Sequence, residues 1–212
     1  MRRSSRSQPT PAPSAGRTSR GDSEKVEALF AHYADDEADI GPTGVERLCD
    51  DLGISTTDIR ILLLAWRLKA SRMGYFSRDE WRQGLKGLRV DSLDKLKRVL
   101  PSLQDEVANP YTFKEFYQFA FRFCLTEPLQ KTLDIETATV MLELVLGTHP
   151  HLPTFVQFLQ EQKEYKAINL DQWTAFLRFC NEVKPDLSNY DESQAWPLLL
   201  DNYVEWAKEK QH

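Results

Sequence analysis

The sequence predicts an all-α protein, and three observations lead to that prediction. Apolar residues recur every three or four positions in most segments after residue 23, which is the period of a helix with one buried face. Residues that favour helix N-caps precede several of these segments. No stretch alternates apolar and polar residues over more than two or three positions, as a half-buried strand would.

The helices are expected in a regular series along the chain. The first places Val26, Phe30 and Tyr33 on one face, and the third is apolar on nearly every side, so it should be buried in the middle of the domain. The predicted helices before the last one cover Glu24–Tyr33, Thr43–Leu52, Ile59–Ala70, Arg78–Leu88, Ser92–Leu100, Phe113–Cys124, Ile135–Leu146, Leu152–Gln162 and Leu170–Val183.

Local signals set the expected ends of these helices. Pro101 should stop or redirect a helix, because proline lacks the backbone donor, and Gly147 is typical of a helix end. A capping pair combines an N-cap side chain with a glutamate or glutamine three residues later. Such pairs are Ser77 with Glu80, Thr112 with Glu115, and Asn169 with Gln172, whereas Ser55–Asp58 only resembles one, and Ser92 and Asp134 cap alone.

Composition fits one domain, expected at 24–210, behind a disordered basic tail at 1–23. Aromatic residues make up 11% and apolar residues 41% of the 212 residues, which suffices for a core. No apolar run approaches the length that a membrane-spanning helix needs. The tail is rich in Ser, Pro and Arg, a composition that cannot offset the entropy of ordering. It could be a nuclear-targeting or phosphorylatable segment, an organellar transit peptide, or a linker.

The charge is divided unevenly between the tail and the domain. Residues 1–22 carry five arginines and one aspartate, a net charge of +4, so the remainder carries −9 of the total −5. An acidic domain repels nucleic acid, and we expect no nucleic-acid partner. Its charge suits a basic protein partner, mainly by steering the encounter.

Neither a cofactor, a metal site nor a catalytic site is expected. Cys49, Cys124 and Cys180 are odd in number and far apart, which argues against a disulfide framework and fits a reducing compartment. His149 and His151 lack the further ligands that zinc needs. Nucleophile-elbow, Walker, GxGxxG and HExxH motifs are absent from the sequence.

Two loops have the shape of calcium-binding EF-hand loops without their ligands. In Lys69–Glu80 the turn glycine falls at Gly74 and the acidic last position at Glu80, but Lys69 stands where the first carboxylate should be. In Tyr33–Gly44 both the first and the last positions lack a carboxylate. We therefore expect degenerate EF-hand-like helix–loop–helix units, followed by a C-terminal helical part, and no bound calcium.

The last stretch, from 187 to 207, has the most specific sequence motif of the chain. A helix should begin around Trp196–Pro197, with Leu199, Leu200, Tyr203 and Trp206 on its buried face. Asp201 falls off that face and should be solvated. By pattern alone this is a C-terminal helix that closes a helical domain.

The same stretch resembles the defective-in-cullin-neddylation family, whose shared module is the potentiating-neddylation (PONY) domain. The resemblance runs from about Val26 to Lys208. It is carried by SNYDE at 188–192, AWPLLLD at 195–201, VEW at 204–206, LCDDLGI at 48–54, LLLAWRLKA at 62–70, FKEFYQFAF at 113–121 and LDIETA at 133–138. The segments MGYFSRDEW, MLELVLG and YVEW look most like the sequences of the family branch without a ubiquitin-associated domain.

The resemblance implies a function. Proteins of this family act as ligase-like scaffolds without catalytic residues, in the nucleus and cytoplasm. They hold a cullin C-terminal domain beside the conjugating enzyme that carries the ubiquitin-like modifier. We expect such a protein to act as a monomer. The alternatives are a divergent EF-hand-like calcium sensor and a helical adaptor unrelated to cullins.

The resemblance also implies two sites. An acidic patch for the cullin falls on Asp171, Ala195 and Asp201, although Asp171 alone could simply complement a helix dipole. A pocket for the acetylated N-terminal methionine of the conjugating enzyme falls on Ile61, Leu64, Met73, Phe76, Phe123, Met141 and Leu144. By spacing alone these apolar residues are ordinary core, and methionine makes the pocket adaptable.

Overall fold

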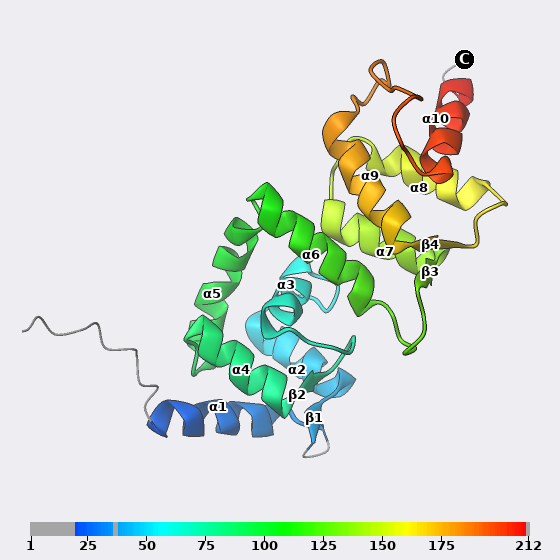
Figure 1. Cartoon of the computed structure of the whole chain (residues 1–212). Helices are drawn as coiled ribbons and strands as arrows, with labels where there is room; N and C mark the ends of the chain where they lie inside the picture. Colours follow the sequence, from blue (N-terminus) through cyan, green and yellow to red (C-terminus); the bar gives the residue numbers. More distant parts are fainter. Residues whose placement is uncertain (1–19, 36–37, 211–212) are drawn as a thin grey trace, which may run out of the picture.

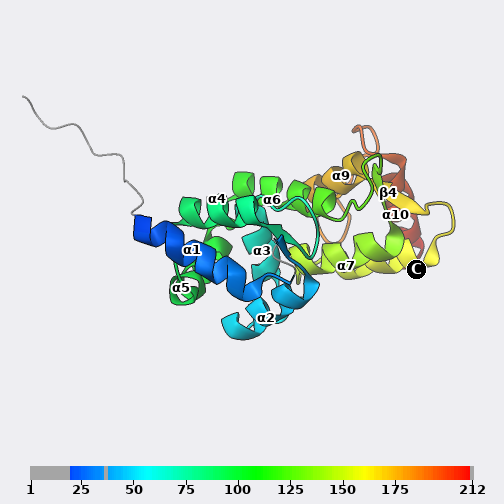
Figure 2. The ribbon, with the colours of Figure 1, turned by 90° about the horizontal axis from the view of Figure 1, so that it is seen from below.

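The computed structural model describes residues 20–35 and 38–210, and within them the chain forms ten α-helices and four short strands. The chain builds an elongated molecule in which α1 to α5 form one half and α7 to α10 the other, with α6 joining them (Figures 1 and 2). The helices are α1 (Arg20–Tyr33), α2 (Pro42–Leu52), α3 (Ile59–Leu68), α4 (Arg78–Leu88), α5 (Leu93–Glu106), α6 (Pro110–Phe123), α7 (Ile135–Leu146), α8 (Leu152–Glu161), α9 (Leu170–Glu182) and α10 (Leu198–Lys210).

The mostly helical fold is confirmed, and the structure adds two short strand pairs that the all-α prediction did not include. β1 (Asp39–Ile40) pairs antiparallel with β2 (Phe76–Ser77), and β3 (Thr132–Asp134) pairs antiparallel with β4 (Ala167–Asn169). Each pair joins two loops that connect consecutive helices. The strands are two or three residues long, too short to show the alternation that identifies a strand in a sequence.

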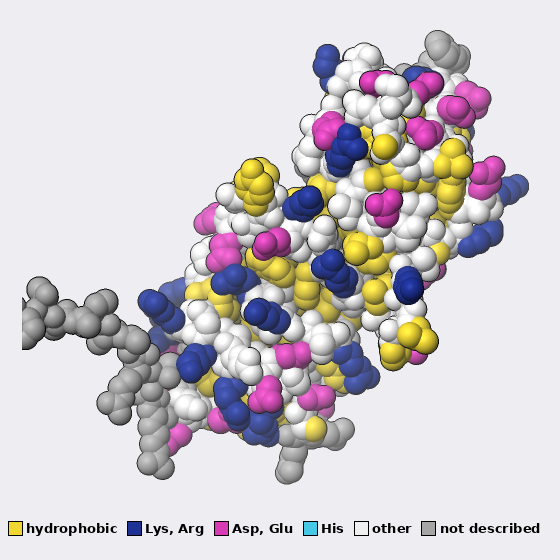
Figure 3. All heavy atoms as spheres, in the orientation of Figure 1, with side chains coloured by type: hydrophobic (Ala, Val, Ile, Leu, Met, Phe, Trp, Pro, Cys, Tyr) yellow, Lys and Arg dark blue, Asp and Glu magenta, His cyan; other side chains and the backbone are white. Residues whose placement is uncertain are grey.

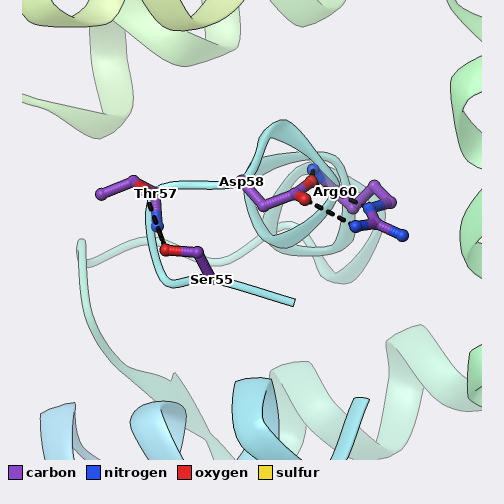
Figure 4. Close-up of polar contacts among 4 residues, drawn as sticks. All are labelled: Ser55, Thr57, Asp58 and Arg60. Atoms are coloured by element: carbon purple, nitrogen blue, oxygen red, sulfur yellow. Dashed lines mark hydrogen bonds and ion pairs between the residues drawn. The ribbon is translucent and has the colours of Figure 1, made fainter. Parts of the chain in front are cut away.

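The helix α3 lies at the centre of the first half, as its apolar sequence predicts. It packs against α4, α5 and α6, and Leu63 and Leu64 are completely buried. Its start is fixed by the Asp58 side chain, which accepts hydrogen bonds from the backbone N–H of Arg60 at 2.8 Å and from its guanidinium (Figure 4). Ser55 instead accepts from the Thr57 backbone, so Asp58 alone is the cap.

The chain joins its two halves through α6, which packs against α3, α7 and α9. Tyr117 on α6 and Trp173 on α9 hold the joint. The Tyr117 hydroxyl donates to the Trp173 carbonyl at 3.1 Å, the Trp173 indole donates to the Tyr117 carbonyl at 2.9 Å, and the rings stack 4.7 Å apart. Both side chains are fully buried, so each polar tip has a partner where water cannot reach.

Several helix ends differ from the sequence prediction. α1 begins at Arg20, four residues before the predicted helix start at Glu24, and residues 1–19 lie outside the described residues. α3 ends at Leu68, where Lys69 adopts a left-handed conformation with φ 55°. α10 begins at Leu198, one residue after Pro197.

Two further differences have clear causes. Pro101 does not stop α5, which continues to Glu106 because Leu103, on the same face as Leu96 and Leu100, is buried in the core. Pro101 itself is exposed. α6 begins earlier than expected, because Asn109 accepts from the backbone of the next turn and Pro110 follows it.

The predicted Thr112–Glu115 capping pair is wrong, because Asn109 caps α6 and Thr112 lies in its first turn. The other predicted caps are confirmed. Ser77 with Glu80 and Asn169 with Gln172 form complete capping boxes. Ser92 and Asp134 accept from the backbone three residues later, and Gly147 ends α7 with φ 56°. Among the described residues, no helix is both long enough and apolar enough to cross a membrane.

Candidate functional site

A groove of about 870 Å³ lies where α6 begins beside α9. Residues 107–114 form one wall, the outward face of α9 forms the other, and residues 195–197 close one end. Tyr111 on the first wall is 84% exposed, although it is a large aromatic residue. We call this hollow the α6–α9 groove.

Two of the three residues of the predicted acidic patch line this groove. Asp171 stands in the first turn of α9 and is exposed, and Ala195 lies in the extended segment before α10. They are 24 positions apart in the sequence and line one groove because residues 194 and 196 return to Arg178 on α9. The small Ala195 side chain lets a partner approach this part of the groove closely.

Asp201 lies outside the groove lining, at the start of α10. The expectation that it is solvated is only partly right, because it is half-buried and its carboxylate accepts a hydrogen bond from the Tyr190 hydroxyl. Burial and this carboxylate raise the pKa of Tyr190. The Tyr190 ring stacks 6.1 Å from the ring of Trp196, so the Tyr190 side chain connects Asp201 to Trp196, the residue next to Ala195.

Acidic side chains gather over the end of the molecule formed by residues 183–197 and α10, whereas Lys and Arg side chains are more numerous over α1, α4 and α5 (Figure 3). The acidic side is therefore the half that contains Asp171 and Asp201. This distribution fits a basic partner at that end.

The seven residues of the predicted methionine pocket lie on α3, α6, α7 and the loop containing β2. Leu64, Phe76 and Phe123 are buried, Leu144 is half-buried, and Met73 is 42% exposed. None of the seven lines the α6–α9 groove or the two smaller hollows, one beside α7 and one beside α4. The pocket remains a prediction.

The last positions of the two EF-hand-like loops are occupied by contacts within the protein. Glu80, at the last position of Lys69–Glu80, accepts from the backbone N–H of Ser71 and of Ser77, each at 2.8 Å. Burial alone would raise the pKa of Glu80, but these hydrogen bonds together lower it. At Gly44, the last position of the other loop, an added Cβ would lie 2.0 Å from the Tyr33 carbonyl oxygen, so no ligating side chain fits there.

We expect a calcium titration followed by calorimetry to give no measurable heat of binding, and calcium to leave the melting temperature unchanged. Binding would require Glu80 to give up two backbone hydrogen bonds beside the positive charge of Lys69. Magnesium serves as the matched control salt. A calcium isotherm in the micromolar range would contradict this prediction.

Other metal or nucleophilic sites are not found in the described chain. No group of three or more His, Cys, Asp or Glu residues there is placed to hold a metal ion. The three cysteines are buried and unpaired, and burial raises the pKa of Cys49 to about 11 and of Cys124 and Cys180 to about 12. Such thiols stay protonated and unreactive at neutral pH.

A protein-family model described as "Cullin binding" matches residues 95–206, which include every residue of the α6–α9 groove. The chain belongs to the cullin-binding family. The chain is 45% identical over 183 residues to DCN1-like protein 4 of Homo sapiens, covering 86% of this chain but only 62% of that protein, less than two thirds of its length. It is 43% identical over 190 residues to DCN1-like protein 5 of Homo sapiens, covering 89% of this chain and 79% of that protein.

A third member of this DCN1-like family, DCN1-like protein 2 of Dictyostelium discoideum, is 43% identical over 183 residues, 86% of this chain and 68% of that protein. The family resemblance predicted from the sequence is therefore confirmed. DCN1-like proteins 4 and 5 belong to the branch without a ubiquitin-associated domain, as the sequence wording predicted.

Sequence reasoning missed several residues of the groove. It did not single out Tyr111 or Lys114, and it treated Trp196 only as part of a buried face, whereas Trp196 is half-buried and lines the groove. It also overlooked Arg178. The spacing of seven residues from Asp171 to Arg178 is two helical turns, which places both on one face and could have identified the second.

Proposed function

We propose that this protein promotes neddylation of cullins as a scaffold that binds a cullin C-terminal domain and the conjugating enzyme charged with the modifier. The observation that supports this most is the position of Asp171 and Ala195 in one groove within the segment matched to cullin-binding proteins. The rate gain comes from proximity and orientation. The buried, high-pKa cysteines fit a protein that contributes no nucleophile of its own.

In this proposal the fold consists of two pairs of EF-hand-like helix–loop–helix units. The first pair contains α1–α2 and α3–α4, and the second contains α6–α7 and α8–α9. Within each pair, one short antiparallel strand pair joins the two loops, as in paired calcium-binding loops. The internal hydrogen bonds of Glu80 then do what a bound ion would otherwise do, which argues against the calcium-sensor alternative.

We also propose that the protein acts as a monomer in the nucleus and cytoplasm. Its three unpaired cysteines fit a reducing compartment.

The direct test measures binding to an isolated cullin C-terminal domain and the rate of cullin modification in a reconstituted reaction. We expect saturable binding, together with a faster transfer when the protein is added to the cullin and the charged conjugating enzyme. The helical-adaptor alternative predicts neither effect. Transfer that stays at its unassisted rate despite tight cullin binding would refute the scaffold role.

The predicted methionine pocket should recognise N-terminal acetylation of the conjugating enzyme. An unacetylated amine is charged near neutral pH, and burying it unpaired among Leu64, Phe76 and Phe123 would be costly. An acetylated peptide from that N-terminus should therefore bind at least about tenfold more tightly than the same peptide with a free amine. Calorimetry with the two peptides measures this ratio, and equal affinities would refute the pocket assignment.

A further inference from the structure

Arg178 links α9 to the segment that closes the α6–α9 groove. Its Nε atom lies 3.0 Å from each carboxylate oxygen of Glu182, one turn further along α9. Its terminal nitrogen donates to the side-chain oxygen of Gln194 at 2.8 Å. The guanidinium carbon lies 4.2 Å from the ring centroid of Trp196. One side chain thus contacts three others, two of them in the segment 194–196.

These contacts fall on both neighbours of Ala195. Gln194 precedes it and Trp196 follows it, and the Trp196 backbone N–H donates to the Gln194 carbonyl at 2.8 Å. Ala195 itself is exposed and has only a methyl side chain, so it has no side-chain bond that could fix its position. Its place on the groove rim depends on the two residues that Arg178 holds.

We propose that Arg178 is a positioning residue, which fixes Ala195 at the groove rim in the conformation that the cullin binds. This inference rests on the proposed function. The planar guanidinium can bond a carboxylate and an amide in its own plane while its face lies over an aromatic ring, an arrangement that a lysine ammonium cannot reproduce.

A positioning role for Arg178 and the positive charge of Arg178 predict opposite changes in cullin affinity when this residue is replaced. Arg178 places a cation on a surface proposed to bind a basic partner, and simple electrostatics predicts that its loss strengthens binding. Glu182 offsets this charge, and its carboxylate raises the pKa of the Arg178 guanidinium. If Arg178 acts by holding the rim, its loss must weaken binding instead.

The test compares Arg178→Met with the wild-type protein. Methionine keeps an unbranched apolar stem but removes the charge and the donors. We expect the dissociation constant for the cullin C-terminal domain to rise about tenfold. In the free protein, the backbone amides of residues 194–196 should exchange faster with solvent, because their segment is held less firmly. Binding of the acetylated conjugating-enzyme peptide should not change.

Arg122→Met is the matched control. Arg122 is exposed on α6 and does not line the α6–α9 groove, so the same chemical change there should alter neither cullin affinity nor exchange at 194–196.

A double-mutant cycle with Gln194→Ala separates positioning from direct contact. If Arg178 acts through Gln194, the second substitution should cost little cullin affinity once the first is present. Additive losses would mean that Arg178 and Gln194 act on cullin binding independently, which would overturn the proposal that Arg178 holds the rim through Gln194. Unchanged or tighter cullin binding by Arg178→Met would overturn it too.

The exchange measurement needs no partner and therefore tests the inference separately from the proposed function. Unchanged exchange at 194–196 in Arg178→Met would refute the positioning role even if the cullin binds. Absence of cullin binding by the wild-type protein would refute the proposed function, and with it the role of the rim in docking.

Discussion

Replacing Ala195 with arginine should abolish binding to a cullin C-terminal domain while the protein stays folded. Ala195 is exposed and lines the α6–α9 groove, as Asp171 does. A long cationic side chain there fills the space into which the partner must come and repels a basic surface, a combination that costs several kcal/mol. An exposed position usually tolerates substitution within about half a kcal/mol of stability. Calorimetry with the cullin domain and thermal unfolding measure the two effects.

Ala31→Arg is the matched control for this variant. Ala31 is exposed on α1, in the other half of the molecule (Figure 1), so the same substitution should leave cullin affinity unchanged. The Ala195→Arg protein should still bind the acetylated conjugating-enzyme peptide, yet fail to accelerate cullin modification. Wild-type cullin affinity in Ala195→Arg would show that the cullin binds another surface.

Helix positions could be predicted because their signals are local. Cap residues such as Ser77, Asp134 and Asn169 act on backbone groups within one turn, and the structure uses all three as caps. Burial follows from helical spacing in the same way, as the nearly all-apolar sequence of α3 shows.

The sequence contains a signal for the two strand pairs that the sequence analysis did not use. An apolar residue stands directly before the N-cap of α2, α4, α7 and α9, and all four such residues are buried: Ile40, Phe76, Leu133 and Ile168. Each lies in one of the short strands. A single buried residue does not identify a strand, but its recurrence before four helix starts indicates paired loops.

At Pro101, core packing outweighs the local rule that proline ends a helix. Proline in a helix interior removes one backbone hydrogen bond. Here the buried Leu103 lies beyond it on the core face, and the apolar surface that it buries favours continuation of α5. Only the position of the core decides this outcome, and the sequence does not give that position.

The α6–α9 groove could not be predicted from the sequence, because it forms only in the tertiary structure. Asp171 and Ala195 could each be named from their resemblance to a family, but nothing local places residue 195 over α9. That placement depends on the Arg178 contacts with Gln194 and Trp196, which join residues 16 and 18 positions apart. The half-burial of Asp201 also depends on a residue at a distance, because its hydrogen-bond donor is Tyr190.

Asp201→Arg should both prevent cullin binding and lower the free energy of unfolding. Charge reversal in the acidic half adds repulsion against a basic partner. The half-buried Tyr190 hydroxyl also loses its carboxylate acceptor, a change that costs about 1 kcal/mol at a partly exposed position. The sequence alone placed Asp201 in solvent, where a substitution usually changes stability by no more than about half a kcal/mol. Denaturant unfolding and cullin binding measure the two effects.

Tyr190→Phe separates stability from recognition at the same site. It removes the hydroxyl that donates to Asp201 but leaves the carboxylate in place. We expect this variant to lose about as much stability as Asp201→Arg, roughly 1 kcal/mol, yet to keep most of its cullin affinity. If Tyr190→Phe prevents cullin binding as completely as Asp201→Arg does, the cullin depends on the geometry of this pair rather than on the charge of Asp201. If Asp201→Arg instead binds the cullin as the wild type does at moderate salt, Asp201 lies outside the contact surface and the acidic patch reduces to Asp171 and Ala195.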